Sequence, residues 1–316
     1  MTGFRTNQWL PAWGLAVLLL LPLAAGVRAD ARFFYSGDGH IRLVGRKNGA
    51  AFEGVYRNAS GRYEAGALQA VYRVFDAPYA PERPRLALRL IEFLDYLEDH
   101  LGPGARITIT SGYRSPAYNR KVRQGGGLAA KASLHQYGMA ADFIMEGVPS
   151  RQVWAKVKAL GFGGTGYYHG ATVHVDVGPA RYWDEKTSGV GTGLTDDNKL
   201  IGMVTDFDIY PPQAVVTMRF IRMTAFPIGV AAAFDLRRRS ESGAVVQTIT
   251  FRPEFAVPVK GACPSLADID QMAFIRWRLP ANLPPGRYDI EARFCASRWD
   301  RMPATVTTPT FEIRRP

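Results

Sequence analysis

The stretch SLHQYGMAAD, residues 133–142, places His135 seven positions before Asp142. A second stretch, TVHVDVG at residues 172–178, holds another histidine and another aspartate, and the whole chain has only 5 histidines. A catalytic zinc ion usually takes three protein ligands and leaves a fourth position for water. His135, Asp142 and His174 are therefore a candidate ligand set. Histidines in polar loops are more often simply hydrogen-bonded, so the spacing alone leaves both interpretations open.

The local sequence favours a curved loop followed by a strand. Gly138 allows the backbone to bend between the first two candidate ligands. The second stretch alternates as strands do, so Thr172, His174 and Asp176 are expected on the same side. Asp176 would then stand beside His174, where it could orient the ligand or act on a water molecule.

Outward from these stretches, residues 30–184 predict a mixed set of helices and strands. The clearest helix lies within residues 84–102, where apolar residues recur at helical spacing. Its apolar stripe consists of Leu90, Phe93, Leu94, Leu97 and Leu101. Further helices are expected over 64–75, in the stretch that begins SGYRSPAYN, and over 150–161, where Ser150 is the expected cap. Strands are expected within 32–57 and over 106–110, 165–168 and 172–178. Without a regular strand–helix–strand order, this predicts an α+β domain around an antiparallel sheet.

Beyond that domain the composition changes. Residues 185–199 are rich in Gly, Thr and Asp and predict a linker. Residues 200–316 contain six or so short strand-like runs separated by Pro, Gly and Ser, which favours an all-β sandwich, with an immunoglobulin-like arrangement as one candidate. Cys263 and Cys295 are the only cysteines. We expect them to form a disulfide, the alternative being two buried thiols.

The N-terminus predicts export. Residues 1–29 combine Arg5, an apolar run and a small-residue cleavage site after Ala29, which is typical of a secretory signal peptide; an uncleaved anchor is the alternative. The rest of the chain has no run apolar enough to span a membrane, so we expect an exported, periplasmic or cell-envelope protein. Removing Arg5 and Arg28 lowers the net charge from +11 to +9. Cell-wall polymers or lipid headgroups are the expected anions and nucleic acid is not, although a generally basic surface would explain the charge equally well.

Three motifs in order carry a family resemblance: SGYRSPAYN, SLHQYGMAAD and TVHVDVGPARYW. Over about residues 32–184 the chain resembles the zinc D-Ala-D-Ala metallopeptidases, most of all their murein endopeptidase K-like branch, within a wider group that includes lysostaphin and hedgehog. The resemblance implies that His135, Asp142 and His174 bind Zn²⁺. It also implies that Arg114 neutralises charge on the substrate or oxyanion and that Ser133 contacts substrate.

The chain departs from that resemblance at the catalytic base. Better-known relatives carry an acidic residue three positions before the last histidine, or a histidine two before it, where this chain has Ala171 and Thr172. Two candidates remain, Asp176 and His169. The strand direction favours Asp176, because a base must reach the reacting water through a hydrogen bond.

The resemblance implies hydrolysis of amide bonds in peptidoglycan stem peptides or cross-links, as a murein endopeptidase. A D-Ala-D-Ala carboxypeptidase and a zinc-containing module without catalysis are the alternatives, and in a third reading the sandwich domain carries the function by binding cell wall or a partner protein. Tyr113 and Tyr168 are expected to line the substrate cleft, although such tyrosines more often pack in cores and at rims.

Overall fold

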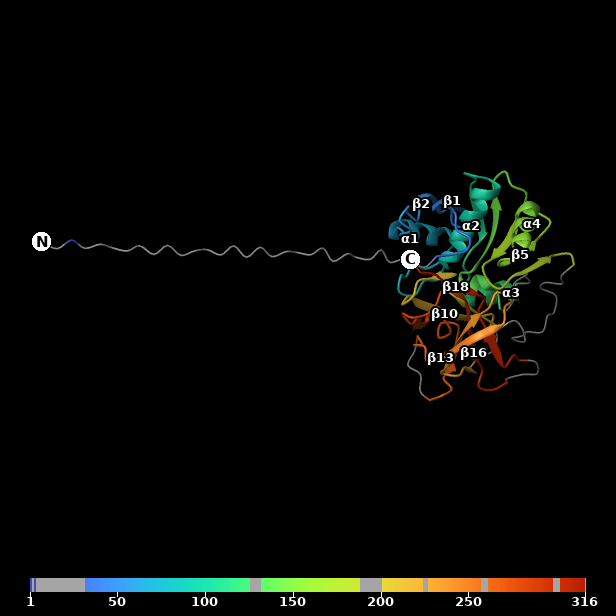
Figure 1. The fold of residues 1–316 in the computed structure, drawn as a ribbon. Helices are drawn as coiled ribbons and strands as arrows, with labels where there is room; N and C mark the ends of the chain where they lie inside the picture. Colours follow the sequence, from blue (N-terminus) through green and yellow to red (C-terminus); the bar gives the residue numbers. More distant parts are fainter. Residues whose placement is uncertain are drawn as a thin grey trace.

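The computed structural model describes Met1, Gly3 and residues 32–125, 132–187, 201–223, 227–256, 261–297 and 302–315. The predicted signal peptide lies outside the described residues apart from Met1 and Gly3, and so do residues 188–199 of the predicted linker. We call residues 32–187 the N-terminal region and residues 201–315 the C-terminal region. Each region has its own cluster of buried apolar side chains, and the two stand one above the other in Figure 1.

The N-terminal region is built on a seven-stranded sheet in the order β2-β1-β3-β4-β6-β5-β7. Two of its pairings, β1 with β3 and β5 with β7, are parallel, so the expectation of a purely antiparallel sheet was wrong. The first pairing is parallel because two helices lie in the long connection between β1 and β3. The strands are β1 (His40–Gly45), β2 (Ala51–Val55), β3 (Ile107–Ser111), β4 (Ala140–Met145), β5 (Gly164–Tyr167), β6 (Val173–Asp176) and β7 (Arg181–Asp184).

The predicted helices are present. They are α1 (Ala65–Val74), α2 (Leu88–Leu101), α3 (Pro116–Gln124) and α4 (Ser150–Leu160), with a short 3-10 helix η1 (Leu134–Tyr137). The predicted stripe of α2 faces the core: Leu90, Phe93, Leu94 and Leu97 are fully buried. The predicted cap of α4 was wrong, because Pro149 occupies the N-cap and the Ser150 hydroxyl donates to Gly170 O instead.

The C-terminal region consists of strands, as the sequence predicted. Its sheets are β15-β10-β8, a sheet that runs β13-β12-β16-β18-β9 with β17 beside β16, and the pair β11-β14. The strands are β8 (Gly202–Thr205), β9 (Ile209–Tyr210), β10 (Val215–Ile221), β11 (Ile228–Gly229), β12 (Phe234–Arg239), β13 (Val245–Phe251), β14 (Ser265–Leu266), β15 (Ile275–Arg278), β16 (Gly286–Arg293), β17 (Thr305–Thr307) and β18 (Phe311–Ile313).

Two contacts hold the C-terminal region together. Phe220 of β10 and Phe234 of β12 meet with ring centroids 6.2 Å apart, which joins the two larger sheets face to face. The expected disulfide between Cys263 and Cys295 is present and closes a separation of 32 residues. The mixed α/β region followed by a β region therefore agrees with the predicted fold class, and the immunoglobulin-like arrangement stays a prediction.

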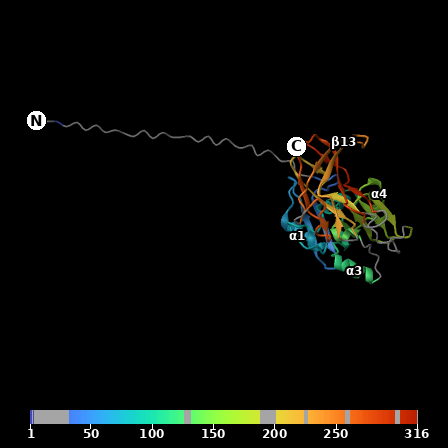
Figure 2. The same cartoon turned by 90° about the horizontal axis from the view of Figure 1, so that it is seen from below.

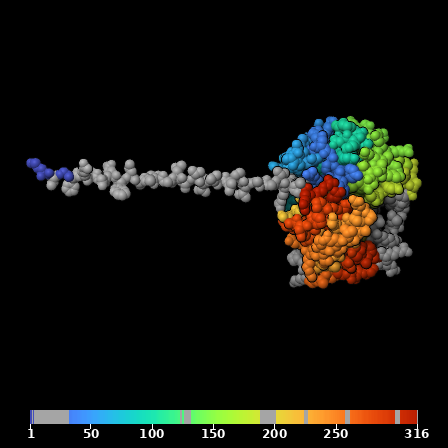
Figure 3. Space-filling view, in the orientation of Figure 1, coloured from blue at the N-terminus to red at the C-terminus, as the bar shows by residue number. Residues whose placement is uncertain are grey.

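The two regions pack directly against each other. Val204 and Ile221 of the C-terminal region are buried in the apolar cluster of the N-terminal region. A buried ion pair joins Arg89 Nη2 to Asp208 Oδ1 at 2.8 Å. The space-filling view shows the two halves in close contact, and the view from below shows their elements overlapping (Figures 2 and 3). No helix within the described residues is both long enough and apolar enough to pass through a bilayer.

Candidate metal centre

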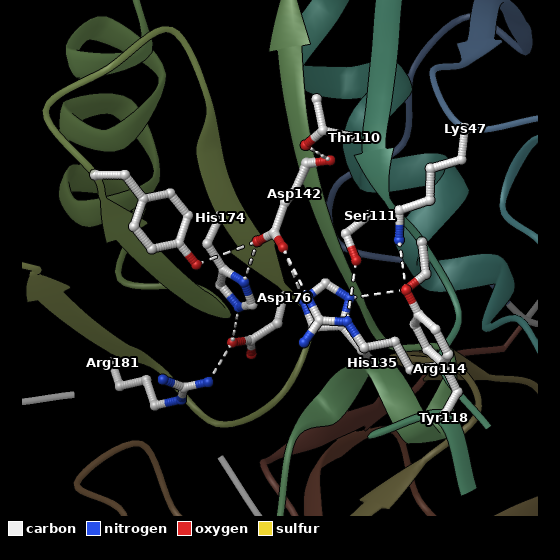
Figure 4. A network of polar contacts seen from close by, with 12 residues as sticks. Lys47, Thr110, Ser111, Arg114, Tyr118, His135, Asp142, His174, Asp176 and Arg181 are labelled. Atoms are coloured by element: carbon white, nitrogen blue, oxygen red, sulfur yellow. Dashed lines mark hydrogen bonds and ion pairs between the residues drawn. The ribbon is translucent and has the colours of Figure 1, made fainter. Parts of the chain in front are cut away.

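Two neighbouring strands and a one-turn helix bring the three predicted metal ligands together. Asp142 on β4 pairs directly with His174 on β6, and His135 lies in η1 just before β4. One ligand atom from each of these residues lies within 4.8 Å of the others. All three side chains are buried. We call His135, Asp142 and His174 the metal cluster (Figure 4).

Gly138 makes the turn between η1 and β4 possible. Its φ is +62°, in the left-handed region that favours glycine. A Cβ at this position would also collide with the carbonyl oxygen of Arg85. The sequence prediction that Gly138 curves the chain between the first two ligands is therefore confirmed.

Each histidine of the metal cluster has one ring nitrogen held from behind and the other facing Asp142. His135 Nδ1 lies 2.8 Å from Gly112 O, and its Nε2 lies 3.5 Å from Asp142 Oδ2. His174 Nε2 lies 3.1 Å from Asp176 Oδ2, and its Nδ1 lies 2.9 Å from Asp142 Oδ1. Metal-binding histidines are held in this way, because an acceptor on one nitrogen leaves the lone pair of the other for the metal. The residues present fit a zinc ion.

The charges within the cluster oppose the effect of burial. Burial alone would raise the pKa of Asp142, but charge interaction and hydrogen bonding with His135 and His174 hold that pKa well below its ordinary value. Burial lowers the pKa of His135 below its ordinary value, although Asp142 pulls it upward. Burial lowers the pKa of His174 as well, but hydrogen bonds to Asp142 and Asp176 outweigh it and raise that pKa above its ordinary value.

Asp176 lies behind His174, on the far side of the imidazole from Asp142 (Figure 4). It is fully buried, accepts the backbone N–H of Gly178 at 3.0 Å and pairs with Arg181 Nη2 at 2.6 Å. Asp176 thus contacts the ring nitrogen of His174 that does not face Asp142, which is the position of an orienting partner.

Two further predicted residues contact the ligand carboxylate of Asp142. Arg114 Nη2 lies 3.1 Å from Oδ2, and its Nε donates to Ser111 Oγ at 3.0 Å. The Tyr168 hydroxyl donates to Oδ1 at 3.3 Å. Both residues therefore stand at the metal cluster and are placed to hold Asp142 in position.

The remaining predicted residues lie further out. His169, one residue after Tyr168, is 29% exposed at its side chain, and its Nε2 lies 2.7 Å from Asp184 Oδ1. Ser133 is half-buried at the N-cap of η1, without a side-chain capping bond. Tyr113 packs against the apolar cluster of the N-terminal region. Burial raises the pKa of its hydroxyl, while the charge of Arg85 lowers it and that of Asp270 raises it.

The sequence analysis did not identify Arg181 and Trp183 as residues that lie near His174. Arg181 and Trp183 share one face of β7, as alternate strand residues do. The Trp183 ring lies 4.7 Å from the His174 ring, and the Arg181 guanidinium lies 4.4 Å above Trp183. The alternation in ARYW was the available signal, but only the pairing of β5 with β7 brings it to the metal cluster.

Comparisons with known proteins match the part of the chain that carries this cluster. The family described as "Peptidoglycan L,D-endopeptidase MepK" matches residues 37–183. The protein of that name from Escherichia coli K12 is 37% identical over 95 residues, which cover 30% of this chain and 52% of the relative. The "Probable peptidoglycan L,D-endopeptidase MepK" of Haemophilus influenzae is 41% identical over 80 residues, or 25% of this chain and 43% of the relative.

The chain thus spans about half the length of the curated relatives it matches. Among solved structures, an alkylpurine DNA glycosylase AlkC of Pseudomonas fluorescens bound to abasic-site DNA aligns with a TM-score of 0.23 and 13% identity, over 36% of this chain and 30% of that one. A similarity this low does not indicate a common fold. The segment matched by the family, residues 37–183, contains all three residues of the metal cluster. Through residues 37–183, the chain is similar to the peptidoglycan L,D-endopeptidase MepK family.

Proposed function

We propose that this protein is a zinc-dependent peptidoglycan hydrolase that cleaves amide bonds in stem peptides or their cross-links. The observation that carries the proposal is the metal cluster, in which three ligand atoms lie within 4.8 Å of one another. Both histidines have their second nitrogen held by an acceptor, as metal ligands do. The names of the curated relatives favour an L,D-endopeptidase over a carboxypeptidase.

In this proposal His135 Nε2, a carboxylate oxygen of Asp142 and His174 Nδ1 hold the zinc ion. A zinc ion so held supplies Lewis-acid activation of a water molecule and of the scissile carbonyl group. Asp176 keeps the proton of His174 on Nε2 and so leaves Nδ1 free to coordinate. Arg114 and Tyr168 hold Asp142 from its other side, and Arg114 adds the positive charge that a developing oxyanion requires.

His169 is the proposed proton acceptor, because the second candidate, Asp176, lies behind a ligand. The His169 side chain is partly exposed, and Asp184 Oδ1 lies 2.7 Å from its Nε2. A carboxylate in this position orients the imidazole and stabilises its protonated form. Tyr168, the preceding residue, contacts Asp142, so this loop borders the metal cluster.

The substrate places the protein outside the cytoplasm. Peptidoglycan lies in the cell envelope, which agrees with the signal peptide predicted over residues 1–29 and with a disulfide in the C-terminal region. The net charge of +11 on the full chain suits an anionic wall polymer. We further propose that Ser133 and Tyr113 contact the substrate, and that residues 30–184 and 200–316 act as two domains joined by 185–199.

The test combines metal content with digestion of purified, cross-linked muropeptides. The protein without its signal peptide is expected to bind one zinc ion and to release cleaved peptides, whereas His135→Ala loses both. His100→Ala is the matched control, because His100 is exposed on α2 with its Nδ1 against Tyr96 O. Absence of zinc from the unaltered protein would contradict the proposal.

One observation favours a second candidate function, a zinc-containing binding module without catalysis. Ala171 and Thr172 stand where relatives are expected to carry a base, and Asp176 is turned away from the reacting side. One zinc ion per chain with no cleavage of any muropeptide would favour this candidate. Sedimentation of the intact protein with purified cell-wall sacculi would then measure the binding.

A further inference from the structure

One arginine of the C-terminal region, Arg222, lies near Asp176, the carboxylate that contacts His174. Arg222 follows β10 directly and is only 6% exposed. Its φ of +59° lies in the left-handed region, which a non-glycine residue enters only at a cost in free energy. Its Nη2 is buried and has no hydrogen-bond partner among the described residues. Burying a cation in a strained backbone conformation costs free energy, so we expect a nearby charge that offsets this cost.

The position of Arg222 is defined by Gly178. A Cβ built on Gly178 would lie 3.1 Å from Asp176 Oδ1 and 3.6 Å from Arg222 Nη2. The carboxylate and the guanidinium thus border the same small space, which is open because residue 178 has no side chain.

The two oxygens of Asp176 have different surroundings. Oδ2 contacts His174 Nε2 and Arg181 Nη2, both from the N-terminal region. Oδ1 accepts the backbone N–H of Gly178 and lies on the side of Arg222. The Arg181 side chain is 35% exposed, so solvent screens its charge, whereas the charge of Arg222 acts in a drier environment.

The backbone on both sides of Arg222 is held against the N-terminal region, in part through η1. Ile221, its neighbour, is buried in the apolar cluster of the N-terminal region. On the other side, the backbone N–H of Met223 donates to the Tyr137 hydroxyl at 3.2 Å. Arg219 Nη1 donates to Tyr137 O at 3.1 Å, and Tyr137 lies in η1 together with His135. The C-terminal region therefore holds η1 and places Arg222 in the same contact.

We infer that Arg222 is a positioning residue of the metal centre: it compensates the buried charge of Asp176, which in turn orients His174. This inference rests on the proposed zinc function. It gives the C-terminal region a definite task, because the N-terminal region by itself would leave Asp176 with one partly exposed cation. Loss of Arg222 would weaken the hold on His174 without removing any ligand.

The first test needs no metal. A double-mutant cycle combines Arg222→Met with Asp176→Asn, and unfolding of the full chain is followed with a chelator present. Arg222→Met is expected to lower Tm in the unaltered background. In the Asp176→Asn background it is expected to have no such effect, because the cation then has no carboxylate to compensate. An equal loss of Tm in both backgrounds would overturn the inference.

The second test measures zinc affinity by competition with a chelator. Arg222→Met is expected to weaken zinc binding by about tenfold, the low end for partners of metal ligands, and Arg222→Lys to recover most of that loss. Arg278→Met is the matched control, since it removes an exposed arginine of the C-terminal region that contacts Gln213 O. An equal loss in Arg278→Met and Arg222→Met, or none in either, would overturn the assigned role.

The two tests separate this inference from the proposed function. If the unaltered protein binds no zinc, the proposed function fails, and the double-mutant cycle still decides whether Arg222 acts on Asp176. If Asp176→Asn does not fold, the zinc affinities of the Arg222 and Arg278 variants decide the question by themselves.

Discussion

Within the described part of the chain, two groups of side chains bring three potential ligand atoms within 4.8 Å: the metal cluster, and a second group formed by Asp38, Asp95 and Asp99. We call the second group the aspartate cluster. It joins α2, which carries two of its members, to the segment before β1. The two clusters have the same size and differ in what surrounds their ligand atoms.

In the aspartate cluster, donors of the protein already occupy one carboxylate oxygen of Asp95 and one of Asp99. Asp95 Oδ2 accepts the N–H of Gly39 at 2.9 Å and the hydroxyl of Tyr56 at 2.7 Å, and Asp99 Oδ2 accepts the N–H of Asp38 at 2.9 Å. In the metal cluster, acceptors stand behind both histidines and free the opposite nitrogens. Proximity of three acidic or basic groups is therefore not enough for a metal site. The partners behind them decide which lone pairs are available.

The largest expected effect tests this comparison directly. Asp142→Asn removes the only carboxylate of the metal cluster and is expected to abolish zinc binding and muropeptide cleavage. Asp99→Asn, the same change in the aspartate cluster, is expected to leave both unchanged. Metal content and digestion of the two variants provide the measurement. Loss of zinc in Asp99→Asn would show that the comparison is wrong.

A smaller effect is expected at the proposed proton acceptor. His169→Gln should retain zinc and lower kcat by about 10²–10⁴-fold, the range for loss of a general base. Asp184→Asn should give a weaker loss, because it removes only the partner that orients His169. Steady-state rates on one purified cross-linked muropeptide measure both. An unchanged kcat in His169→Gln would exclude this residue as the base.

A third effect concerns the support behind His174. Asp176→Asn retains the shape of the side chain but loses its charge, so zinc affinity should fall by about 10–100-fold. The same substitution at Asp95, in the aspartate cluster, should not change zinc affinity. Chelator competition at fixed pH measures both variants. If Asp176→Asn binds zinc as tightly as the unaltered protein, the orienting role of Asp176 is refuted.

The smallest effect is a dependence of stability on pH that arises in the aspartate cluster. Burial raises the pKa of Asp95 to about 7, above its usual value near 4 in an unfolded chain. The folded state therefore holds the proton more tightly, and its contribution to stability is lost as the pH rises from about 4 through about 7.

Asp95→Asn removes this titration. The difference in Tm, variant minus unaltered protein, should increase from about pH 4.5 to about pH 7.5, which is roughly the interval between the two pKa values. A chelator is present in both samples, so that zinc does not contribute. Glu241→Gln is the control, since Glu241 is exposed and lies outside the aspartate cluster. A constant difference in Tm over this interval would mean that Asp95 does not titrate there.

The sequence by itself determined several of the elements and the candidate ligands. Helix α2, the strands that carry Asp142 and His174, and the turn at Gly138 follow from local periodicity and backbone preference. The order of three motifs identified the ligand set. These features could be predicted because they depend on neighbours within a few residues.

Only the tertiary structure decided which ring nitrogen of each histidine is free and on which side of His174 Asp176 lies. Strand alternation placed Asp176 beside His174, but it does not tell which ring nitrogen of His174 the Asp176 carboxylate contacts. The sheet became mixed because of its long connections, and Arg222 of the other region came to lie beside Gly178, near Asp176. Such contacts arise from packing between distant segments, and no local pattern in the sequence records them.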